Sequence, residues 1–286
     1  MANIRLIKRR IKSADNISQI TKAMEMVAAS KMKKAQEKAL QGKPYAQKIY
    51  QAVLELSSHI DKKQHPLLAK GNPSGKLLIL IISTNKGLCG GLNTNLFRAA
   101  NRWWGSEKNI DFVSVGNKGK NFISRSRKNL VADFSQHASF HEIVPAITAV
   151  LVTGFLKGTY KEVYLVYNTF LSALKQIPTK KLLIPIESIQ TENDAPRENF
   201  AEFVIEPGVY DVLSNLLPHY IENQIRSAIF EAEACEHSAR MMAMKNATDA
   251  ASDLTEELTL LYNKARQEKI TYEIADLVTA RLAVEF

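Results

Sequence analysis

Residues 219–286 read HYIENQIRSAIFEAEACEHSARMMAMKNATDAASDLTEELTLLYNKARQEKITYEIADLVTARLAVEF. These 68 residues contain no glycine and no proline, and the same holds for residues 1–41. Glycine and proline are the residues that most often interrupt a helix, and an average helix has only about 12 residues. We therefore predict one long helix at each end of the chain. A 68-residue helix would extend roughly 100 Å, too far for a compact domain to enclose.

The apolar residues of both tracts recur every three or four positions. In the first tract they are Ile4, Ile7, Ile11, Ala14, Ile17, Ile20, Met24 and Val27. In the second they are Ile221, Ile225, Ala228, Ala232, Cys235, Ala239 and Met242 and, after a slip, Ala247, Ala251, Leu254, Leu258, Leu261, Ala265, Ile270, Ile274 and Leu277. This spacing predicts a coiled-coil seam of irregular phase, and its small residues would allow close approach. Two amphipathic helices of a larger helical domain are the alternative, but they leave the length unexplained.

The charge of the chain is unevenly distributed. Residues 1–43 carry 11 Lys and Arg against 3 acids, whereas residues 219–286 carry 7 against 12. These net charges of +8 and −5 favour pairing of the two tracts with each other. A net charge of +9 for the whole chain also raises nucleic-acid binding as an alternative. However, no aromatic residue separates the positive charges of residues 1–43 to stack on bases.

The middle of the chain alternates between strand and helix patterns. Strands are predicted at Lys76–Ser83, Asp111–Val115, Leu130–Phe134, Glu162–Leu171, Lys181–Ile186 and Phe200–Ile205, and helices at Asn93–Trp104, Lys118–Arg127 and Glu142–Leu156. This alternation is typical of a parallel or mixed α/β sheet. The longest stretch without a charge, residues 143–156, is shorter than the roughly 18 apolar residues of a membrane-spanning helix. We expect no crossing of a bilayer.

Three features resemble catalytic motifs without completing them. The glycine-rich stretch TNKGLCGGLN, residues 84–93, follows a strand but lacks the GxxxxGK[ST] spacing, so we interpret Gly87, Gly90 and Gly91 as a tight turn that lets backbone segments approach. His141 and Glu142 begin an HExxH pattern that position 145, a proline, leaves incomplete. Cys89 has no base near it in sequence and is interpreted as a packed small residue. We predict no catalytic residue, no metal site and no cofactor.

Several longer strings carry a resemblance. Residues 20–31 read ITKAMEMVAASK, residues 87–93 read GLCGGLN, residues 239–249 read ARMMAMKNATD, residues 262–267 read YNKARQ, and residues 270–273 read ITYE. In order and position they resemble the gamma subunit of the rotary F-type ATP synthase, of the bacterial type. After Asp276 the family pattern has Gly-Ala, where this chain has Ala280-Arg281.

The resemblance implies a fold, partners and a contact surface. The expected fold is α/β: a long antiparallel coiled coil of the N- and C-terminal helices with an inserted α/β, Rossmann-like globular domain. The expected domains are 1–60, 75–206 and 207–286. The implied role is a non-catalytic rotor that couples c-ring rotation, driven by protons or sodium ions, to the catalytic sites of the complex. Its implied partners are the alpha, beta and epsilon subunits and the c-ring, peripheral to the cytoplasmic face of the cell membrane. The implied contacts with beta are Lys22, Met24, Arg266, Gln267, Thr271 and Glu273.

Overall fold

The computed structural model describes residues 4–58, 65–107, 109–136, 140–186, 205–206 and 208–284. They form two compact units. One, here called the end unit, combines Met1–Ala29 with Arg240–Phe286. The other, the body unit, comprises Ser30–Ala239. The predicted division into 1–60, 75–206 and 207–286 stays a prediction.

The two long helices are longer than the tracts free of glycine and proline. Helix α1 runs from Ile4 to Ser58 through Gly42 and Pro44, and α5 runs from Val209 to Val284 through Pro218. A proline inside a helix removes one hydrogen bond and costs about 3 kcal/mol. Packing of the flanking turns offsets this cost, because Val53 on α1 and Leu217 and Ile221 on α5 are completely buried.

The end unit is a two-helix coil with small side chains at its centre. On α1 the buried residues lie seven positions apart, at Ile7, Ala14, Thr21 and Ala28. Their partners on α5 include Met244, Ala251 and Ala265, also in heptad phase. The Oγ1 atoms of Thr21 and Thr248 are hydrogen-bonded at 2.7 Å and fix the register. A strict seven-residue repeat is the pattern of a left-handed coiled coil.

The predicted phase of this seam was wrong over the second half of the first tract. Ile17, Ile20 and Val27, which were assigned to the seam, are 52%, 60% and 56% exposed. The buried positions lie one residue later, at Thr21 and Ala28. On α5, Leu254 and Leu261 are likewise exposed. The heptad register set by Ile7 and Ala14 continues unbroken, so it places small and polar residues inside and larger apolar residues outside.

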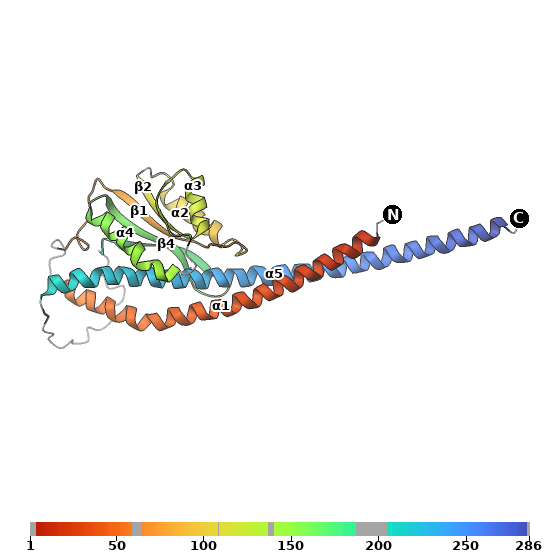
Figure 1. Cartoon of the computed structure of the whole chain (residues 1–286), viewed down its shortest axis with the longest axis horizontal. Coiled ribbons are helices and arrows are strands. Elements are labelled where there is room, and N and C mark those ends of the chain that lie inside the picture. Colours follow the sequence, from red (N-terminus) through yellow and green to blue (C-terminus); the bar gives the residue numbers. More distant parts are fainter. Residues whose placement is uncertain are drawn as a thin grey trace. The chain divides into compact units, whose positions relative to one another are not determined.

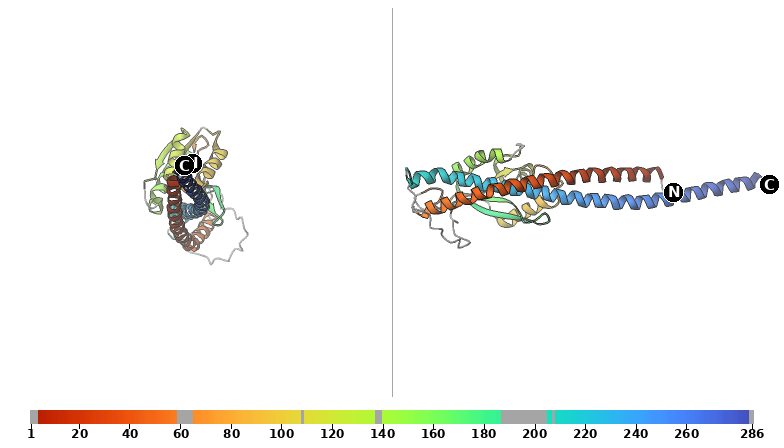
Figure 2. Two further views of the ribbon diagram at one scale, coloured as in Figure 1. Left: turned by 90° about the vertical axis from the view of Figure 1, so that its right-hand side faces the viewer. Right: turned by 90° about the horizontal axis from the view of Figure 1, so that it is seen from below.

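In the body unit α1 and α5 lie side by side and run antiparallel (Figure 1; Figure 2). The Lys38 ammonium lies 6.0 Å from the centre of the Phe230 ring. One turn or more further along α1, Tyr45 is hydrogen-bonded to His219, and Tyr50 packs beside Tyr220. From Lys38 to Tyr50 on α1 the partner on α5 changes from Phe230 to Tyr220, so the two helices run in opposite directions and the predicted antiparallel pairing is confirmed.

A five-stranded sheet with the order β3-β2-β1-β4-β5 forms the rest of the body unit. Its strands are β1 (Lys76–Ile82), β2 (Ile110–Val115), β3 (Asn129–Asp133), β4 (Tyr160–Phe170) and β5 (Gln176–Ile184). All neighbours are parallel except β4 and β5. The connections contain α2 (Leu92–Trp104), α3 (Asn117–Arg125), the 3-10 turn η1 (Phe140–Ile143) and α4 (Val144–Leu156). The predicted mixed α/β domain is confirmed.

Strand β1 explains why the sheet is covered on both faces. Its central residues are entirely apolar and buried, as parallel strands between two helical layers require. Ile79 and Ile81 face α2 and α3 in one cluster, whereas Leu78, Leu80 and Ile82 join the larger cluster that includes α4, α1 and α5. Figure 1 shows α2 and α3 on one side of the sheet and α4 with α5 on the other.

The two predicted strands nearest the second long helix were Lys181–Ile186 and Phe200–Ile205. The last strand starts at Gln176 rather than Lys181 and contains Pro178. Proline is tolerated there because β5 pairs only with β4 and so lies at the sheet edge. The prediction at Phe200–Ile205 falls almost entirely outside the described residues. Among those described, no helix is both long and apolar enough to span a membrane.

The antiparallel register predicts a disulfide between Thr21→Cys and Thr248→Cys in a chain whose native cysteines are replaced by alanine. The two hydroxyls are 2.7 Å apart, so oxidation should link them within one chain. Non-reducing electrophoresis should show a monomer of altered mobility. A control pairing Thr21→Cys with Thr279→Cys, about 45 Å further along α5, should not react internally. A disulfide-linked dimer as the main product would contradict the pairing.

The heptad phase predicts opposite outcomes for neighbouring positions. Ala28→Leu should destabilise the coil by about 1–3 kcal/mol, because Ala28 is only 2% exposed and a larger side chain would separate the helices. Val27→Leu, at a 56% exposed position, should change stability by less than about 0.5 kcal/mol. Hydrogen exchange of amides in residues 4–29 measures both. Equal effects would mean that the seam has the other phase.

Candidate partner-binding surface

All six residues implied as beta contacts lie in the end unit. Lys22 is exposed on α1, and its ammonium forms an ion pair with Glu25 three residues later, at 3.0 Å. Met24 is partly buried beside the seam. Because Thr21 pairs with Thr248, this first group lies at the level of the 240s of α5. It combines a fixed positive charge with an apolar side chain on an accessible surface.

The other four contacts lie on a part of α5 that has no α1 beside it. Ala265 is the last buried residue among the described side chains of the helix, and every side chain from Arg266 to Arg281 is exposed. Figure 1 and Figure 2 show the end of α5 extending beyond the start of α1. Arg266 follows Thr248 by 18 residues, or roughly 27 Å of helix. The structure therefore separates the implied contacts into two groups along the coil.

Short-range contacts hold this second group on the helix surface. The Thr271 hydroxyl donates to the carbonyl of Gln267 at 3.0 Å, which uses its hydrogen atom within the helix. The Glu273 carboxylate pairs with Lys269 at 3.3 Å, and both side chains remain about 60% exposed. Exposed pairs of this kind contribute less than about 1 kcal/mol, so a partner could replace them.

Large apolar side chains on the same stretch lack any cover in the described part of the chain. Ile270, Tyr272, Ile274, Leu277 and Val278 are between 45% and 71% exposed. Ile270, Ile274 and Leu277 were predicted to continue the seam, and that prediction was wrong. Because Thr21 pairs with Thr248 in an antiparallel register, Ile4, the first residue of α1, lies opposite Ala265, and α5 continues beyond that level. Tract length was the signal that could have identified an unpaired end, and such exposed apolar surface marks an interaction site.

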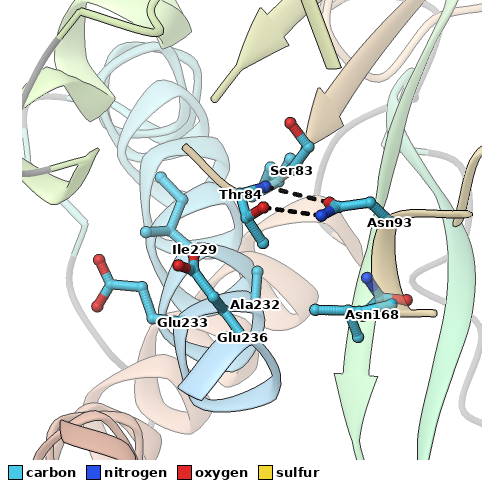
Figure 3. Close-up of a pocket in the computed structure, with 10 residues that line it drawn as sticks. Ser83, Thr84, Asn93, Asn168, Ile229, Ala232, Glu233 and Glu236 are labelled. Atoms are coloured by element: carbon cyan, nitrogen blue, oxygen red, sulfur yellow. Dashed lines mark hydrogen bonds between the residues drawn. The ribbon is translucent and has the colours of Figure 1, made fainter. Parts of the chain in front are cut away.

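The sheet has a position where α/β proteins commonly bind ligands, and here α5 fills it. In such sheets ligands bind at the carboxyl ends of strands where the strand order reverses, which is the boundary between β1 and β4. Figure 3 shows Thr84 and Asn93 on one side of this crevice, Asn168 of β4 on another, and Ala232 and Glu236 of α5 closing it. About 10 Å³ remains, room for one water molecule. A nucleotide would need several hundred Å³.

The glycine-rich loop after β1 is closed by its own hydrogen bonds. The Asn93 amide donates to Thr84 Oγ1 at 2.8 Å and accepts from the Thr84 backbone at 3.3 Å (Figure 3). Leu88 and Gly90 have positive φ angles of 63° and 55°, as a tight turn requires. The turn interpretation is confirmed, but no backbone segment approaches Gly90 closely.

Close backbone approach occurs instead at other glycines, among them Gly116, and Gly119 is packed closely against side chains. A side chain at Gly116, whose φ is 95°, would lie 2.1 Å from the Ser83 carbonyl oxygen. One at Gly119 would lie 2.8 Å from the hydroxyls of Ser83 and Ser114. The Gly119 amide donates to Ser83 Oγ at 2.7 Å. These contacts seat the start of α3 against β1 and leave no room for phosphate there.

Neither cysteine is suited to chemistry. Cys89 and Cys235 are buried in one small cluster with Leu92, which confirms the packing interpretation for Cys89. Burial raises the pKa of the Cys235 thiol to about 12, and its hydrogen is donated to the Asn168 carbonyl. A buried thiol of this kind is unreactive. His137, whose spacing of four residues from His141 could suit a metal ligand on a helix, lies outside the described residues. Among those described, no three His, Cys, Asp or Glu residues gather as metal ligands would.

A pair of opposite charges between β5 and α5 was not predicted either. The Lys181 ammonium donates to Gln224 Oε1 at 2.7 Å. Burial lowers the pKa of Lys181, and burial raises the pKa of Glu231 on α5. Each of the two charges opposes the shift of the other, as partially paired groups do. Nothing in the sequence around Lys181 of β5 or Glu231 of α5 distinguishes the two charges, so only packing identifies the pair.

A family model described as "ATP synthase" matches residues 3–284. The ATP synthase gamma chain of Dehalococcoides mccartyi is 42% identical over 290 residues, covering 99% of this chain and 100% of that protein. The ATP synthase gamma chain of Opitutus terrae is 43% identical, covering 99% of each.

Solved structures agree with this. A chain of the central stalk and c-ring structure of Tetrahymena thermophila mitochondrial ATP synthase is similar with a TM-score of 0.60 and 25% identity, covering 80% of this chain and 99% of that one. A chain of the Euglena gracilis mitochondrial enzyme shares the fold with a TM-score of 0.67 at 19% identity, over 98% of this chain and 94% of that chain. This chain belongs to the family of ATP synthase gamma chains.

Proposed function

We propose that the chain is the central rotor shaft of a bacterial F-type ATP synthase, a non-catalytic subunit that couples c-ring rotation to ATP synthesis and hydrolysis. The observation that carries this proposal is the match over the full length of gamma chains, 99% of this chain and 100% of the relative. Its partners are the alpha and beta subunits, the epsilon subunit and the c-ring. The nucleic-acid alternative has no support among the relatives.

The exposed end of α5 suits insertion into a surrounding ring of subunits. A single helix in water without tertiary contacts is only marginally stable. The exposed residues Ile270, Ile274 and Leu277 lie on one face of the helix, and Tyr272, also exposed, lies about 200° around the axis from Ile270, so a ring would cover apolar groups on both sides. A flat partner surface would cover one face only.

Rotation would change nucleotide affinity through differential contact. A coil of two helices has no threefold symmetry, so it cannot touch three catalytic subunits alike at any moment. Each 1.4 kcal/mol of difference in contact free energy changes an affinity about tenfold. When the shaft turns, each set of contacts would move from one catalytic subunit to the next. The nucleotide affinity that depends on those contacts would move with it.

The side chains proposed to contact beta form two groups, one near the middle of the end unit and one beyond its paired region: Lys22 and Met24, then Arg266, Gln267, Thr271 and Glu273. The separation of roughly 27 Å along α5 would let the groups contact beta at two heights. Pairs between the charged residues of these groups and beta would favour particular rotational positions of the shaft. Met24 and the apolar neighbours would let the shaft surface slide past beta. The chemistry itself belongs to the partner subunits.

We also place the chain at the cytoplasmic face of the cell membrane, held there by the complex. The bacterial relatives support peripheral association with a membrane-bound enzyme. The chain would reach the membrane only through its contact with the c-ring.

The first functional prediction concerns Arg266 and Gln267. Replacing both with alanine should leave the stability of the isolated chain within about 0.5 kcal/mol per site, because both are exposed. ATP turnover of the reassembled complex should fall. Asn263→Ala with Lys264→Ala, on exposed positions one turn earlier, is the matched control and should retain turnover. Equal turnover by both double variants would exclude a special role for Arg266 and Gln267.

A second functional prediction is that the chain has no ATPase activity alone but changes the nucleotide affinities of its partners. Purified alone, it should neither hydrolyse ATP nor bind it tightly, because α5 fills the crevice at β1 and β4. Added to an alpha–beta ring, it should give the three catalytic sites unequal nucleotide affinities. Titration of nucleotide binding with and without the chain measures this. Three sites that remain equivalent in the complex would refute the proposed mechanism, and turnover by the repurified chain would refute the rotor assignment.

A further inference from the structure

A buried histidine holds the turn at residues 65–69, between α1 and β1, and no function so far uses it. His65 is only 4% exposed, a low value for a side chain that can carry a charge. Its carbonyl oxygen accepts hydrogen bonds from the amides of Leu68 and Ala69, both at 3.0 Å. His65 therefore begins a tight turn, and its ring has a fixed place in the body unit.

Hydrogen bonds determine which nitrogen of this ring carries a proton. The Leu67 backbone amide donates to His65 Nδ1 at 3.3 Å, so Nδ1 is an acceptor without a hydrogen. The other nitrogen, Nε2, lies 3.3 Å from Ser214 Oγ on α5. That hydroxyl gives its own hydrogen to the Tyr210 carbonyl at 2.9 Å, so Nε2 must be the donor to it. The imidazole is therefore neutral, with its hydrogen on Nε2.

The turn connects two other segments of the body unit. The Leu67 carbonyl accepts from the amide of Ile186, just after β5, at 3.0 Å. Leu67 and Leu68 are each 3% exposed and belong to the larger core that α1, α4 and α5 share. The His65 ring packs against the Tyr210 ring of α5, with 5.4 Å between their centres. His65 thus lies where the turn, the end of β5 and the first turns of α5 meet.

A second proton on the ring would break this arrangement. An imidazolium is a donor at both nitrogens, so a hydrogen on Nδ1 would point at the hydrogen of the Leu67 amide. The amide would lose its acceptor, and a positive charge would be buried without a partner, both of which oppose folding. In agreement with this geometry, burial lowers the pKa of His65. The turn is compatible only with the neutral ring.

The charged groups around the turn do not offset this effect. Those in the described elements that meet there are Glu55 near the end of α1, Lys70 after the turn, Glu206 before α5, and Tyr210 and Asp211 in its first turn. Burial is the cause of the lowered pKa of His65, and none of these groups opposes it. Because the folded chain binds this proton less readily than the unfolded chain, the stability that His65 contributes is complete above the ordinary pKa of 6.5. It decreases as the pH falls through that value.

We propose that His65 is a pH-sensitive latch, which holds the 65–69 turn to the start of α5 and the end of β5 while its ring is neutral and releases them when the ring is protonated. Release would open the turn and the first turns of α5 locally, while the centre of the sheet stays folded. In a rotor, this joint between the coil and the sheet would loosen as the surrounding pH falls. The proposal does not depend on the rotor role, because the latch lies within the body unit.

Hydrogen exchange of the full chain measures the latch directly. The amides of Leu67 and Ile186 take part in the joint, so their protection factors, corrected for the intrinsic exchange rate at each pH, report its opening. From about pH 7.5 to about pH 5.5 both should fall by about three- to tenfold, tenfold being the limit one unit below the ordinary histidine pKa. Amides at the centre of β1 should keep their protection. Nitrogen NMR of the His65 ring should show a hydrogen on Nε2 at neutral pH and a pKa below 6.5.

Two variants separate His65 from other groups that titrate. In His65→Asn the side-chain oxygen can accept from the amide two residues later, as Nδ1 does, but it does not titrate. The protection factor of Leu67 in this variant should change by less than about twofold over the same pH range. His219→Asn removes an exposed histidine of α5 that pairs with Glu222, and this control should keep the full pH dependence.

Two outcomes would overturn the proposal. One is an equal loss of protection on acidification in the His65→Asn chain. The other is a ring in the unaltered chain that carries its hydrogen on Nδ1 or titrates at or above 6.5. The ring measurement needs no variant, so it decides the matter even if His65→Asn does not fold. Neither result bears on ATP turnover of the assembled complex, so failure of the latch and failure of the rotor role remain distinguishable.

Discussion

The close pairing of α1 with α5 through small side chains is the constraint on which the rest of the structure depends. In the end unit Ala14, Ala28 and Ala251 allow the backbones to approach, and the hydroxyls of Thr21 and Thr248 set the register. That register places the start of α1 opposite Ala265. Beyond Ala265, α5 has no described part of α1 beside it.

Helix α5 also determines what the sheet can do. Its completely buried residues Ile221, Ile225 and Ile229 complete the larger core of the body unit. The following turns, with Ala232 and Glu236, lie in the crevice where an α/β sheet of this topology would receive a ligand (Figure 3). The same helix thus stabilises the sheet and removes its usual site. The α/β domain therefore packs against the helix pair and stabilises it.

The two units use the helix pair differently. In the end unit every buried seam position is filled, which suits a shaft that has to keep its shape while partner subunits press on it. In the body unit the pair opens near Gly42 and Pro44 and leaves a groove between the two helices. The opening is bounded by well-packed turns, because Ile49 and Val53 on α1 return to the core beyond it.

The sequence by itself determined the existence of the long helices, the alternation of strands and helices between them, and the family. These follow from local rules: absence of helix breakers over 41 and 68 residues, the continuous apolar run of β1, and long specific strings. Only the tertiary structure decided the path through Gly42, Pro44 and Pro218, because packing of flanking turns outweighs a local propensity that sequence rules weigh alone. The tertiary structure also decided which residues of α1 face α5. Ile17 and Val27 fit a spacing of three and four residues as well as Ser18 and Ala28 do, so the spacing alone does not choose between the two sets. The burial of Ile270 and Leu277 depends on whether another helix lies beside them. The space for phosphate at the glycine loop depends in the same way on α5. In both cases the helix concerned is more than 100 positions away in the sequence.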